Sequence, residues 1–547
     1  MKDRKVSVAD VLVIGSGLAG LRAAEAAARE GASVIVAGKG IGASPGIMGF
    51  IATTNMDDST EVYYNDLLKS GSYINNRKLA RILAEDSIKE ARNLEELGLE
   101  FDKNGDGSLN LLQPLGCSYP RLVHHKALTG IKASALIRED CKKKGVVFEQ
   151  SIMITELLQH NSKIIGAVGI SLKDGDFVSY LAKAVVLAAG GCGAIYPVTT
   201  YPKNIVGDGY AMAYRAGVEL VDMEFMQFEP CCFVYPESIK GTPIPTTMLM
   251  EGAVLRNIQG ERFMLKYDEK GEKIQKDELS RGIAIEIAEG RGTEHKGVYY
   301  DVTMLPRDMV VINHCIFYDP ALKAGVDLTK EPAEVAPAAH TLMGGVKINE
   351  RCESSKEGLF AAGEVVGGVH GANRLGGAAG AEVLTFGAKA GKYAARFALA
   401  SKEVVPEVKA MELIEKEKKT CLMRKARTQG TLDLAMVREN IHKVMSEEVG
   451  LIKNAEGLNR AYNELTKLEN MLGDLPVTNF KHLTDLYKYE NMITTGKLQI
   501  FASLTRAESR GAHYRSDFPK NNDEKWMKNI VIKQIEGKMK IEILDCK

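Results

Sequence analysis

The sequence predicts an α/β fold: a Rossmann-type domain split along the chain, an inserted mixed α+β segment and a C-terminal helical part. A strand, glycine turn, helix and strand follow one another from residue 9 to residue 39, and two further strands, near residues 185 and 359, also run into glycine clusters. Such turns at strand ends, spread over most of the chain, indicate one large cofactor laid across one sheet. From about residue 405, Lys and Glu dominate and apolar residues recur at helical spacing, which predicts a helical bundle with a polar tail.

The first of these elements carries Gly15, Gly17 and Gly20 in the pattern G-x-G-x-x-G. The first glycine makes a tight turn, the second lets the backbone approach a pyrophosphate, and the third seats the helix on the strand. The helix N-terminus then supplies amide donors for phosphates, so the pattern predicts dinucleotide binding. Where an acid usually holds the ribose, the chain has Gly38 and Lys39, so ribose contacts are expected from the backbone or from elsewhere.

The same elements suggest how the chain divides into domains. Residues 1–234 and 346–403 are expected to form the two parts of the cofactor-binding domain. Residues 235–345 interrupt the scheme and are expected to be an inserted domain, and residues 404–547 the helical domain and its tail. Within the first part, residues 76–97 have the apolar spacing of an amphipathic helix.

Charge and hydropathy exclude several classes of function. Lys and Arg total 71 and so do Asp and Glu, so the formal net charge is zero, and neither nucleic acid nor an anionic membrane is indicated as a partner. The start of the chain lacks the pattern of a cleavable signal, and no uncharged apolar run reaches the length of a membrane span. We expect a cytoplasmic protein, with any membrane contact made through a partner subunit.

The cysteine pattern points away from a metal centre. The nine cysteines include no C-x-x-C pair and have no histidine ladder around them, so no zinc or iron–sulfur site held by this chain alone is expected. Cys231 and Cys232 are neighbours, a spacing at which a disulfide is strained. We interpret them as two small buried residues.

A set of motifs in a fixed order identifies a family. They are GSGLAG at 15–20, SYPRLVHHKALTG at 118–130, LAAGG at 187–191, TTYPKNIVGDGYAMAYRAG at 199–217, HTLMGGVKIN at 340–349, GEVVGGVHGANRLGG at 363–377 and ESRGAHYRSDFP at 508–519. Together they resemble the flavoprotein family of fumarate reductase, succinate dehydrogenase and L-aspartate oxidase. In that family FAD binds a split Rossmann-type domain and a mobile capping domain closes over the flavin. The resemblance therefore implies that the inserted segment is the capping domain and that the cofactor is FAD.

The resemblance also implies how FAD is held. Members with covalent FAD carry a His in an S-H-T-type motif after the second strand, whereas this chain has ASPGIMGF at 43–50, so non-covalent FAD is expected. The FAD contacts implied by motif are Gly15, Gly17, Gly20, Lys39, Ala189, Gly190, Asp208, Glu364, Arg374 and Glu382.

Family chemistry assigns roles to a second set of residues. An alkene accepts a hydride only if the negative charge that develops is stabilised and the neighbouring carbon receives a proton. By resemblance, His340 and Arg374 clamp a substrate carboxylate, Arg281 delivers the proton, and Glu251 is the acid of its relay. The next relay Arg of the family falls at Val254, which departs from the pattern.

Two substrate-binding positions also depart from the family. The family usually has Q-[FY]-H-P, with the His on the second substrate carboxylate, and a Thr before the relay Glu; here these positions are Glu229 and Met250. A desolvated Glu beside a carboxylate would be repulsive by roughly several kcal/mol. We therefore expect a substrate other than fumarate or succinate, such as a 2-enoate whose far end is cationic, hydrogen-bond donating or apolar, or its saturated counterpart. The alternative stays open that Glu229 points away or is protonated and other groups bind a dicarboxylate.

Other functions stay open as alternatives. L-aspartate oxidases commonly have R-E-G-G-H-S where residues 113–118 read QPLGCS, so the acid expected to hold the substrate amine is missing. An adenylylsulfate reductase-like enzyme is a more distant alternative. A non-catalytic electron-transfer subunit of a multisubunit complex would explain Glu229, Met250 and Val254, but it explains less well why the carboxylate clamp is retained.

No nicotinamide-binding domain is evident beyond the predicted FAD unit. Electrons should therefore come from a separate subunit, with an iron–sulfur protein as the first candidate, or from a diffusible carrier.

Overall fold

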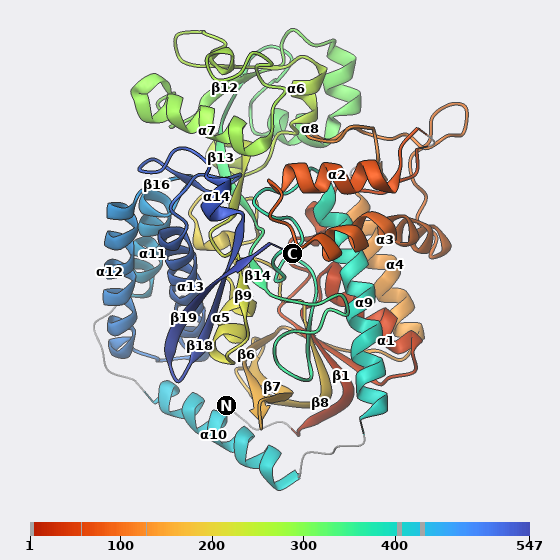
Figure 1. Cartoon of the computed structure of the whole chain (residues 1–547), viewed down its shortest axis with the longest axis vertical. Coiled ribbons are helices and arrows are strands. Elements are labelled where there is room, and N and C mark those ends of the chain that lie inside the picture. Colours follow the sequence, from red (N-terminus) through yellow and green to blue (C-terminus); the bar gives the residue numbers. More distant parts are fainter. Residues whose placement is uncertain (1–4, 56, 127, 402–406, 427–432, 547) are drawn as a thin grey trace.

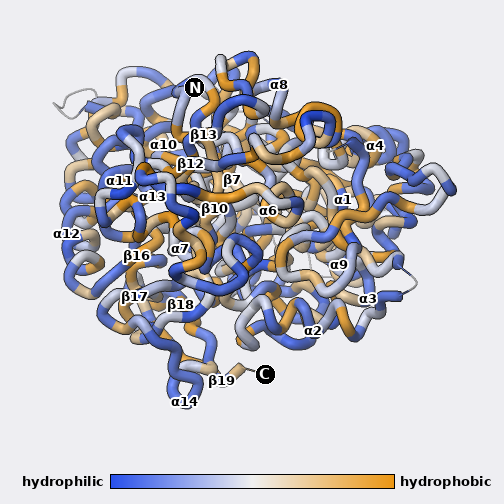
Figure 2. Tube along the Cα trace, turned by 90° about the horizontal axis from the view of Figure 1, so that it is seen from above, coloured by the Kyte–Doolittle hydropathy of each residue, from blue (hydrophilic) through white to orange (hydrophobic). Residues whose placement is uncertain are grey.

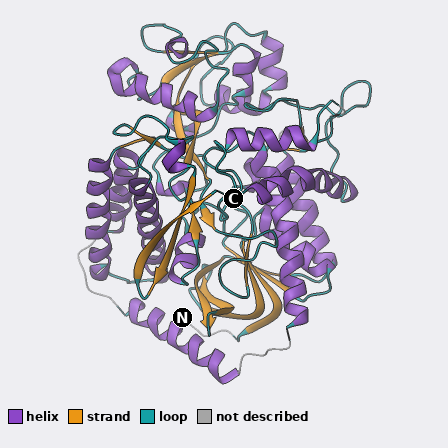
Figure 3. Cartoon of the chain, viewed as in Figure 1, coloured by secondary structure: helices purple, strands orange, loops and turns teal. Residues whose placement is uncertain are grey.

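The computed structural model describes residues 5–55, 57–126, 128–401, 407–426 and 433–546. Figure 1 shows a large sheet at the bottom with helices on its right, a helical bundle on the left, and a smaller mixed unit at the top. Figure 3 shows the same separation between the strands of the sheet and the helices that flank it. In the part of the chain so described, no helix combines the length and the apolar character that a membrane crossing requires.

The predicted strand, helix and strand at the N-terminus are confirmed as β1 (Ser7–Ile14), α1 (Leu18–Arg29) and β2 (Val34–Gly38). Strand β1 is buried in its second half, as a parallel strand covered on both faces must be. It pairs in parallel with β2 on one side and with β8 (Phe177–Leu187) on the other, and β15 (Leu359–Ala361) pairs in parallel with the end of β8. The three glycine-rich turns predicted from the sequence therefore follow neighbouring strands.

The sheet has the order β5-β2-β1-β8-β7-β6, with β15 beside β8. The remaining elements before the inserted unit are η1 (Ser44–Gly46), β3 (Gly49–Ile51), α2 (Thr60–Ser70), α3 (Arg77–Glu96), β4 (Leu122–His124), α4 (Thr129–Lys143), β5 (Val147–Gln150), β6 (Ile152–His160), β7 (Lys163–Ser171), η2 (Gly193–Ile195), α5 (Asp208–Arg215) and β9 (Leu220–Val221). Helix α3 confirms the amphipathic helix predicted over 76–97.

Helix α9 (Ala378–Ala400) packs against α1, and both run along the large sheet. The two helices lie so close that a Cβ atom added at Gly391 would be 2.0 Å from the Ala23 carbonyl oxygen. Only glycine allows this approach, because the obstructing atom belongs to the backbone. The short strand β14 (Gly345–Val346) leads from the inserted unit back to this domain.

The inserted unit is built on a four-stranded sheet of order β10-β13-β12-β11. Strands β10 and β13 form its stem: the chain leaves the large domain along β10 and returns along the antiparallel β13. The unit has its own hydrophobic core, which includes Phe233, Phe263 and Tyr300. Its elements are β10 (Met226–Tyr235), η3 (Glu237–Ile239), α6 (Thr247–Glu251), β11 (Val254–Arg256), η4 (Phe263–Lys266), α7 (Lys276–Glu286), η5 (Ile287–Arg291), β12 (Val298–Asp301), η6 (Met309–Asn313), α8 (Cys315–Lys323) and β13 (Ala333–Leu342).

The C-terminal part contains the predicted helices, and α11, α12 and α13 lie side by side. Its elements are α10 (Glu407–Lys425), α11 (Leu434–Glu448), β16 (Ile452–Lys453), α12 (Ala455–Met471), η7 (Leu472–Asp474), α13 (Phe480–Thr505), β17 (Tyr514–Arg515), α14 (Asp523–Trp526), β18 (Lys528–Ile535) and β19 (Lys538–Asp545). The projecting segment around α14 is mostly hydrophilic (Figure 2).

The prediction of a polar tail is wrong for residues 528–545, which form the hairpin β18–β19. Strand β18 pairs with β9 in a sheet of order β14-β9-β18-β19, so the end of the chain returns to the first domain. Ile530 and Ile532 are fully buried there. The charges interspersed among these apolar residues conceal the strand, because the residues of β19 are mostly exposed and tolerate Lys and Glu.

The division into domains stays a prediction. The boundary at 234/235 falls within β10, and the boundary at 345/346 falls within β14. The boundary at 403/404 lies outside the described residues.

The close contact of α1 with α9 predicts that Gly391→Ala forces the two helices apart. We expect a loss of about 1–3 kcal/mol in the free energy of unfolding, as for other overpacked sites. Urea denaturation followed by FAD fluorescence measures it. Gly473→Ala is the matched control, because a Cβ atom there would meet nothing within 4 Å. Equal stability of the two variants would contradict the packing described here.

Candidate active site

Four charged or titratable side chains from four separate segments meet where the inserted unit joins the large domain. Glu229 lies on β10, His340 on β13, Lys276 is the first residue of α7, and Arg374 lies in the loop before α9. Glu229 pairs with Ala338 across the two strands, which places its side chain next to that of His340, two residues along. The structure thus brings together three residues that the sequence predicts for the substrate site and a fourth, Lys276, that it does not.

The carboxylate of Glu229 is the centre of this group. The Lys276 ammonium donates to its Oε2 atom at 2.5 Å, and the His340 Nε2 atom lies 3.6 Å from the same oxygen. Burial by itself would raise the pKa of Glu229, but the Lys276 and Arg374 cations hold that pKa below its ordinary value. The Glu229 carboxylate therefore lies beside His340 of the predicted clamp, and its lowered pKa favours the ionised form. Which substrate the site binds stays a prediction.

His340 is held from its other ring nitrogen. Its Nδ1 atom is hydrogen-bonded to the Thr200 hydroxyl at 2.8 Å. Burial lowers the pKa of His340 to about 3, an effect that Arg374 and Lys276 reinforce and Glu229 opposes. The imidazole is therefore neutral at physiological pH, and it is suited to meet a ligand by hydrogen bonding rather than by charge.

Arg374 is buried, and its side chain has an unused donor. Its Nη1 atom donates to the Leu375 carbonyl at 3.2 Å, while its Nε atom has no hydrogen-bond partner among the described residues. Burial lowers the pKa of Arg374 below its ordinary value, and Glu229 works against that effect. A buried guanidinium with an unused donor is suited to hold an anionic ligand.

The side chain of Asn373 ties these segments together. Its oxygen accepts from Gln227 Nε2 at 2.7 Å, and its amide nitrogen donates to Gln275 Oε1 and to Asp277 Oδ1, each at 2.9 Å. Gln227 also donates to the Arg374 carbonyl at 3.0 Å. The start of α7 and the loop that carries Arg374 are therefore held in one hydrogen-bond network.

The predicted proton relay is not assembled in the same place. The Arg281 guanidinium lies over the Tyr514 ring, 5.1 Å from its centroid, and Glu251 is hydrogen-bonded to His314 Nε2 at 2.7 Å. Among the described residues no hydrogen bond or ion pair joins Arg281 to Glu251. Residues 276 and 281 lie about 140° apart around an α-helix, so only one of them can face the clamp. That residue is Lys276.

The other two positions that depart from the family lie on α6 and β11. Met250 is 38% exposed, and Val254 is buried in the inserted unit. Sequence reasoning missed Lys276, because no motif marks it and its place at the start of α7 is known only from the structure. Four residues later, the Ser280 hydroxyl donates to the Phe228 carbonyl on β10. That spacing places both residues on the face of α7 that packs against β10.

The predicted FAD contacts lie at the carboxyl ends of the parallel strands or on the helices that follow them. Gly15, Gly17 and Gly20 belong to the turn after β1 and the helix it opens, Lys39 follows β2, Ala189 and Gly190 follow β8, Asp208 begins α5, Glu364 follows β15, and Arg374 and Glu382 lie before and on α9. Ligands in open α/β sheets bind at this edge.

The turn after β1 can only be made by glycine. Gly15 has a φ of +116°, and a Cβ atom there would lie 2.1 Å from the Ala188 carbonyl oxygen. Lys39 and Asp208, both predicted FAD contacts, form an ion pair with each other. Asp208 also accepts from Asn491 at 2.8 Å, which links this edge to the C-terminal helices.

The residues around this edge fit FAD. Three buried polar atoms, Glu382 Oε1, Arg374 Nε and His370 Nδ1, have no hydrogen-bond partner among the described residues. Burial raises the pKa of Glu364 to about 7 and that of Glu382 to about 8, so both can donate as well as accept. Helices α1 and α9 both begin at a glycine, which has no side chain to cap the following amides. The first amide of α1 donates to the Ser44 hydroxyl and that of α9 to the Leu375 carbonyl, so any amide contact with a ligand would come from the neighbouring N–H groups.

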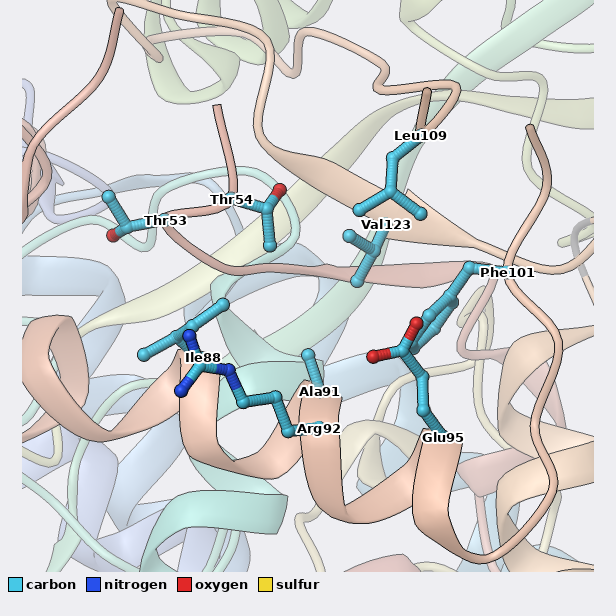
Figure 4. Close-up of a pocket in the computed structure, with 9 residues that line it drawn as sticks. All are labelled: Thr53, Thr54, Ile88, Ala91, Arg92, Glu95, Phe101, Leu109 and Val123. Atoms are coloured by element: carbon cyan, nitrogen blue, oxygen red, sulfur yellow. The ribbon is translucent and has the colours of Figure 1, made fainter. Parts of the chain in front are cut away.

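Two further features lie outside this group. Cys231 and Cys232 are free and buried, and burial raises the pKa of both thiols, in keeping with their interpretation as small buried residues. A separate pocket of about 280 Å³ lies between α3 and the loop after β3, with Thr54, Arg92 and Glu95 in its wall (Figure 4). None of the predicted site residues lines it.

Comparison with known families matches nearly the whole chain. A family model described as FAD binding domain matches residues 10–379, and one described as fumarate reductase flavoprotein C-term matches residues 438–547.

Curated relatives and solved structures agree with these matches. The chain is 38% identical to one of the subunits of fumarate reductase (CoM/CoB) from Methanothermobacter marburgensis, over 96% of each chain. It is 30% identical to the chloroplastic L-aspartate oxidase of Arabidopsis thaliana, over 96% of this chain and 83% of the relative. The structure of E. coli quinol fumarate reductase FrdA superposes with a TM-score of 0.93 at 27% identity, covering 100% of this chain and 97% of the other.

The Asn373 network predicts that Asn373→Ala destabilises the junction. Gln227, Gln275 and Asp277 would lose a partner, at a cost of about 1–3 kcal/mol in the free energy of unfolding. Thermal unfolding of the FAD-loaded protein measures the effect. Asn459→Ala, which removes an exposed amide on α12, is the control and should change stability by less than about 0.5 kcal/mol. A loss no greater than that of the control would mean that the network does not hold the junction.

Proposed function

Because the chain belongs to the flavoprotein family of fumarate reductase, succinate dehydrogenase and L-aspartate oxidase, we propose that it interconverts a C–C and a C=C bond next to a carboxylate. The protein is a FAD-dependent oxidoreductase of this family. The observation that carries the proposal is the convergence of His340, Arg374, Glu229 and Lys276 beside the predicted FAD contacts. This arrangement can hold a small acid against a flavin.

In this proposal the clamp acts electrostatically. Arg374 offers its charge and its free Nε donor to the carboxylate, and His340 adds a neutral hydrogen bond. Together they draw electron density towards the carboxylate and so stabilise the negative charge that develops on the carbon next to it. FAD, when bound, supplies or accepts the hydride at the other carbon.

Lys276 changes which substrates the site can accept. On sequence grounds Glu229 would repel a second carboxylate, but its charge is balanced by the Lys276 ammonium at 2.5 Å. That ammonium has further N–H donors with which it can meet an anion. Since a relative that covers 96% of the chain is named fumarate reductase, fumarate and succinate are the first substrate pair in this proposal.

The second candidate is the substrate class expected from the sequence, a 2-enoate other than fumarate. With His340 neutral, the four side chains carry two positive charges and one negative charge, which balances a single carboxylate. A 2-enoate with one carboxylate and an uncharged or cationic far end fits that balance. Among the alternatives, an L-aspartate oxidase activity is supported by the relatives of that name. The arrangement of the site does not support an adenylylsulfate reductase-like or a non-catalytic role.

The test is reoxidation of photoreduced FAD under anaerobic conditions. Rapid reoxidation by fumarate supports the first candidate, and reoxidation by monocarboxylic enoates but not by fumarate supports the second. Flavin reduction by L-aspartate in the reverse assay would favour the oxidase. If none of these acids exchanges electrons with the flavin, the proposal fails and a non-catalytic role follows.

The segment at 43–50 contains no histidine, so we propose that FAD is bound without a covalent link. Precipitation of the protein with trichloroacetic acid should release all of its yellow colour into the supernatant. Mass spectrometry of the intact denatured chain checks the same point. A mass increased by that of FAD would contradict the proposal.

We propose that electrons reach the flavin through a separate iron–sulfur subunit. In support, the fumarate reductase relative is named as one subunit of its enzyme, and the sequence contains no nicotinamide-binding domain beyond the FAD unit. Purification from the native source, followed by iron analysis of co-eluting chains, addresses this route.

A further inference from the structure

We propose that the pocket between α3 and the loop after β3 binds a small zwitterion with an apolar side chain, of the class of the apolar α-amino acids. The pocket has a volume of about 280 Å³, which is below the usual range for drug-sized ligands, so its occupant should be about as small as an amino acid. None of the four side chains that converge in the candidate active site lines it. The inference therefore goes beyond the proposed function and does not depend on it.

The inner wall of the pocket is apolar. Phe101 and Val123 are buried there, and Ile88, Ala91 and Leu109 complete the apolar lining. Ile88 and Ala91 come from one face of α3, and the other three come from chain segments that follow this helix. Such a wall fits an aliphatic or aromatic side chain, which leaves water when it binds.

Two opposite charges lie at the mouth of the pocket. Arg92 and Glu95 are exposed residues of α3, and Figure 4 shows the guanidinium and the carboxylate on opposite sides of Ala91. Charged residues three positions apart on a helix often pair with one another. Here neither side chain has a hydrogen bond or an ion pair with any other described residue. The guanidinium is free to hold a carboxylate, and the carboxylate is free to hold an ammonium group.

Two buried hydroxyl groups are a second, independent sign of a ligand. The Oγ1 atoms of Thr53 and Thr54 are buried, and neither has a hydrogen-bond partner among the described residues. Both residues line the pocket. A buried hydroxyl without a partner is unfavourable, so a ligand with polar atoms within reach is favoured there.

The combination of these features selects the class of ligand. A simple anion would meet Arg92 but would be repelled by Glu95, and a simple cation would meet the reverse. An α-amino acid carries a carboxylate, an ammonium group and a side chain on one carbon atom. An apolar member of this class can therefore meet both charges and the apolar wall at once.

The pocket shares a strand pair with the edge where FAD is expected. Ile51 of β3 pairs with Leu122 of β4, and a Cβ atom added at Gly377 would lie 2.8 Å and 2.7 Å from their side chains. Gly377 is the residue at which α9 begins, three positions after Arg374. Val123, the next residue of β4, lines the pocket. We therefore expect a ligand in the pocket to change the environment of the flavin through this strand pair.

The test titrates L-leucine into the FAD-loaded protein and follows the heat of binding and the flavin fluorescence. Three analogues each lack one part of leucine: glycine lacks the apolar side chain, isocaproate lacks the ammonium group, and isoamylamine lacks the carboxylate. For leucine we expect a dissociation constant of about 1 mM or less, as the size of the ligand allows. Each analogue should bind at least about tenfold more weakly, because each loses one contact.

Variants assign the binding to this pocket. Arg92→Gln and Glu95→Gln should each weaken leucine binding by about tenfold or more, as the loss of a charge-assisted hydrogen bond does. In Arg92→Gln, leucine and isoamylamine should bind alike, and in Glu95→Gln, leucine and isocaproate should bind alike. Glu96→Gln is the matched control, because Glu96 is the next exposed acid of α3 and does not line the pocket. It should bind leucine as the wild type does.

Thermal unfolding and the flavin spectrum show whether each variant is folded and loaded. The inference is overturned if none of L-leucine, L-methionine and L-phenylalanine gives a saturable heat at about 10 mM, ten times the expected dissociation constant. It is also overturned if leucine binds equally well to the wild type, Arg92→Gln and Glu95→Gln, because the amino acid is then held elsewhere, for example at the carboxylate clamp. Binding without any change in flavin fluorescence would overturn the link to α9. None of these results depends on reoxidation of the flavin, so the proposed function stands or falls separately.

Discussion

A carboxylate buried at a domain junction has to be paired, and much of the candidate site depends on how Glu229 meets that requirement. An isolated buried charge is too costly to persist, so a cation must lie next to it. Lys276 supplies that cation from the start of α7, which fixes the position of the helix against β10. The same carboxylate lies beside His340 on β13. The Oε2 atom of Glu229 thus contacts both Lys276 at the start of α7 and His340 on β13, and so links this helix to the strand pair β10–β13.

The junction is completed by uncharged hydrogen bonds. Asn373 accepts from Gln227 and donates to Gln275 and Asp277, so a single amide connects the stem of the inserted unit, the start of α7 and the loop before α9. Such a network is stable only if its members are satisfied, because an unpaired polar group in a dry interface costs as much as a bond contributes. Glu364 and Glu382, with raised pKa values, lie where the cofactor is expected, and buried polar atoms there lack partners among the described residues.

Glu224, in the same stretch of sequence, is another buried acid that has to be paired with a cation, but its partner lies in the C-terminal part. Glu224, five residues before Glu229, is buried and accepts from Arg506 Nε at 2.6 Å. Arg506 also pairs with Glu508, which accepts from Arg510. This network joins the C-terminal motif to the large domain, next to the place where β18 adds to β9. Of two acids in one apolar stretch, one is therefore paired within the fold and the other lies in the candidate site.

The order of residues along the chain was enough to predict the features that depend on local geometry. Gly15 and Gly20 predict the dinucleotide turn because no other residue allows the backbone to pass so closely, and periodicity predicts α3 and the C-terminal helices. Family motifs led to His340, Arg374 and Glu229, which the structure brings together. Folding in three dimensions was needed to show which cation meets Glu229, because Lys276 is 47 residues away and the face of α7 on which it lies depends on packing against β10. The hairpin β18–β19 was hidden for the same reason: its pairing partner β9 lies some 300 residues earlier, and a strand that is half exposed carries little pattern of its own.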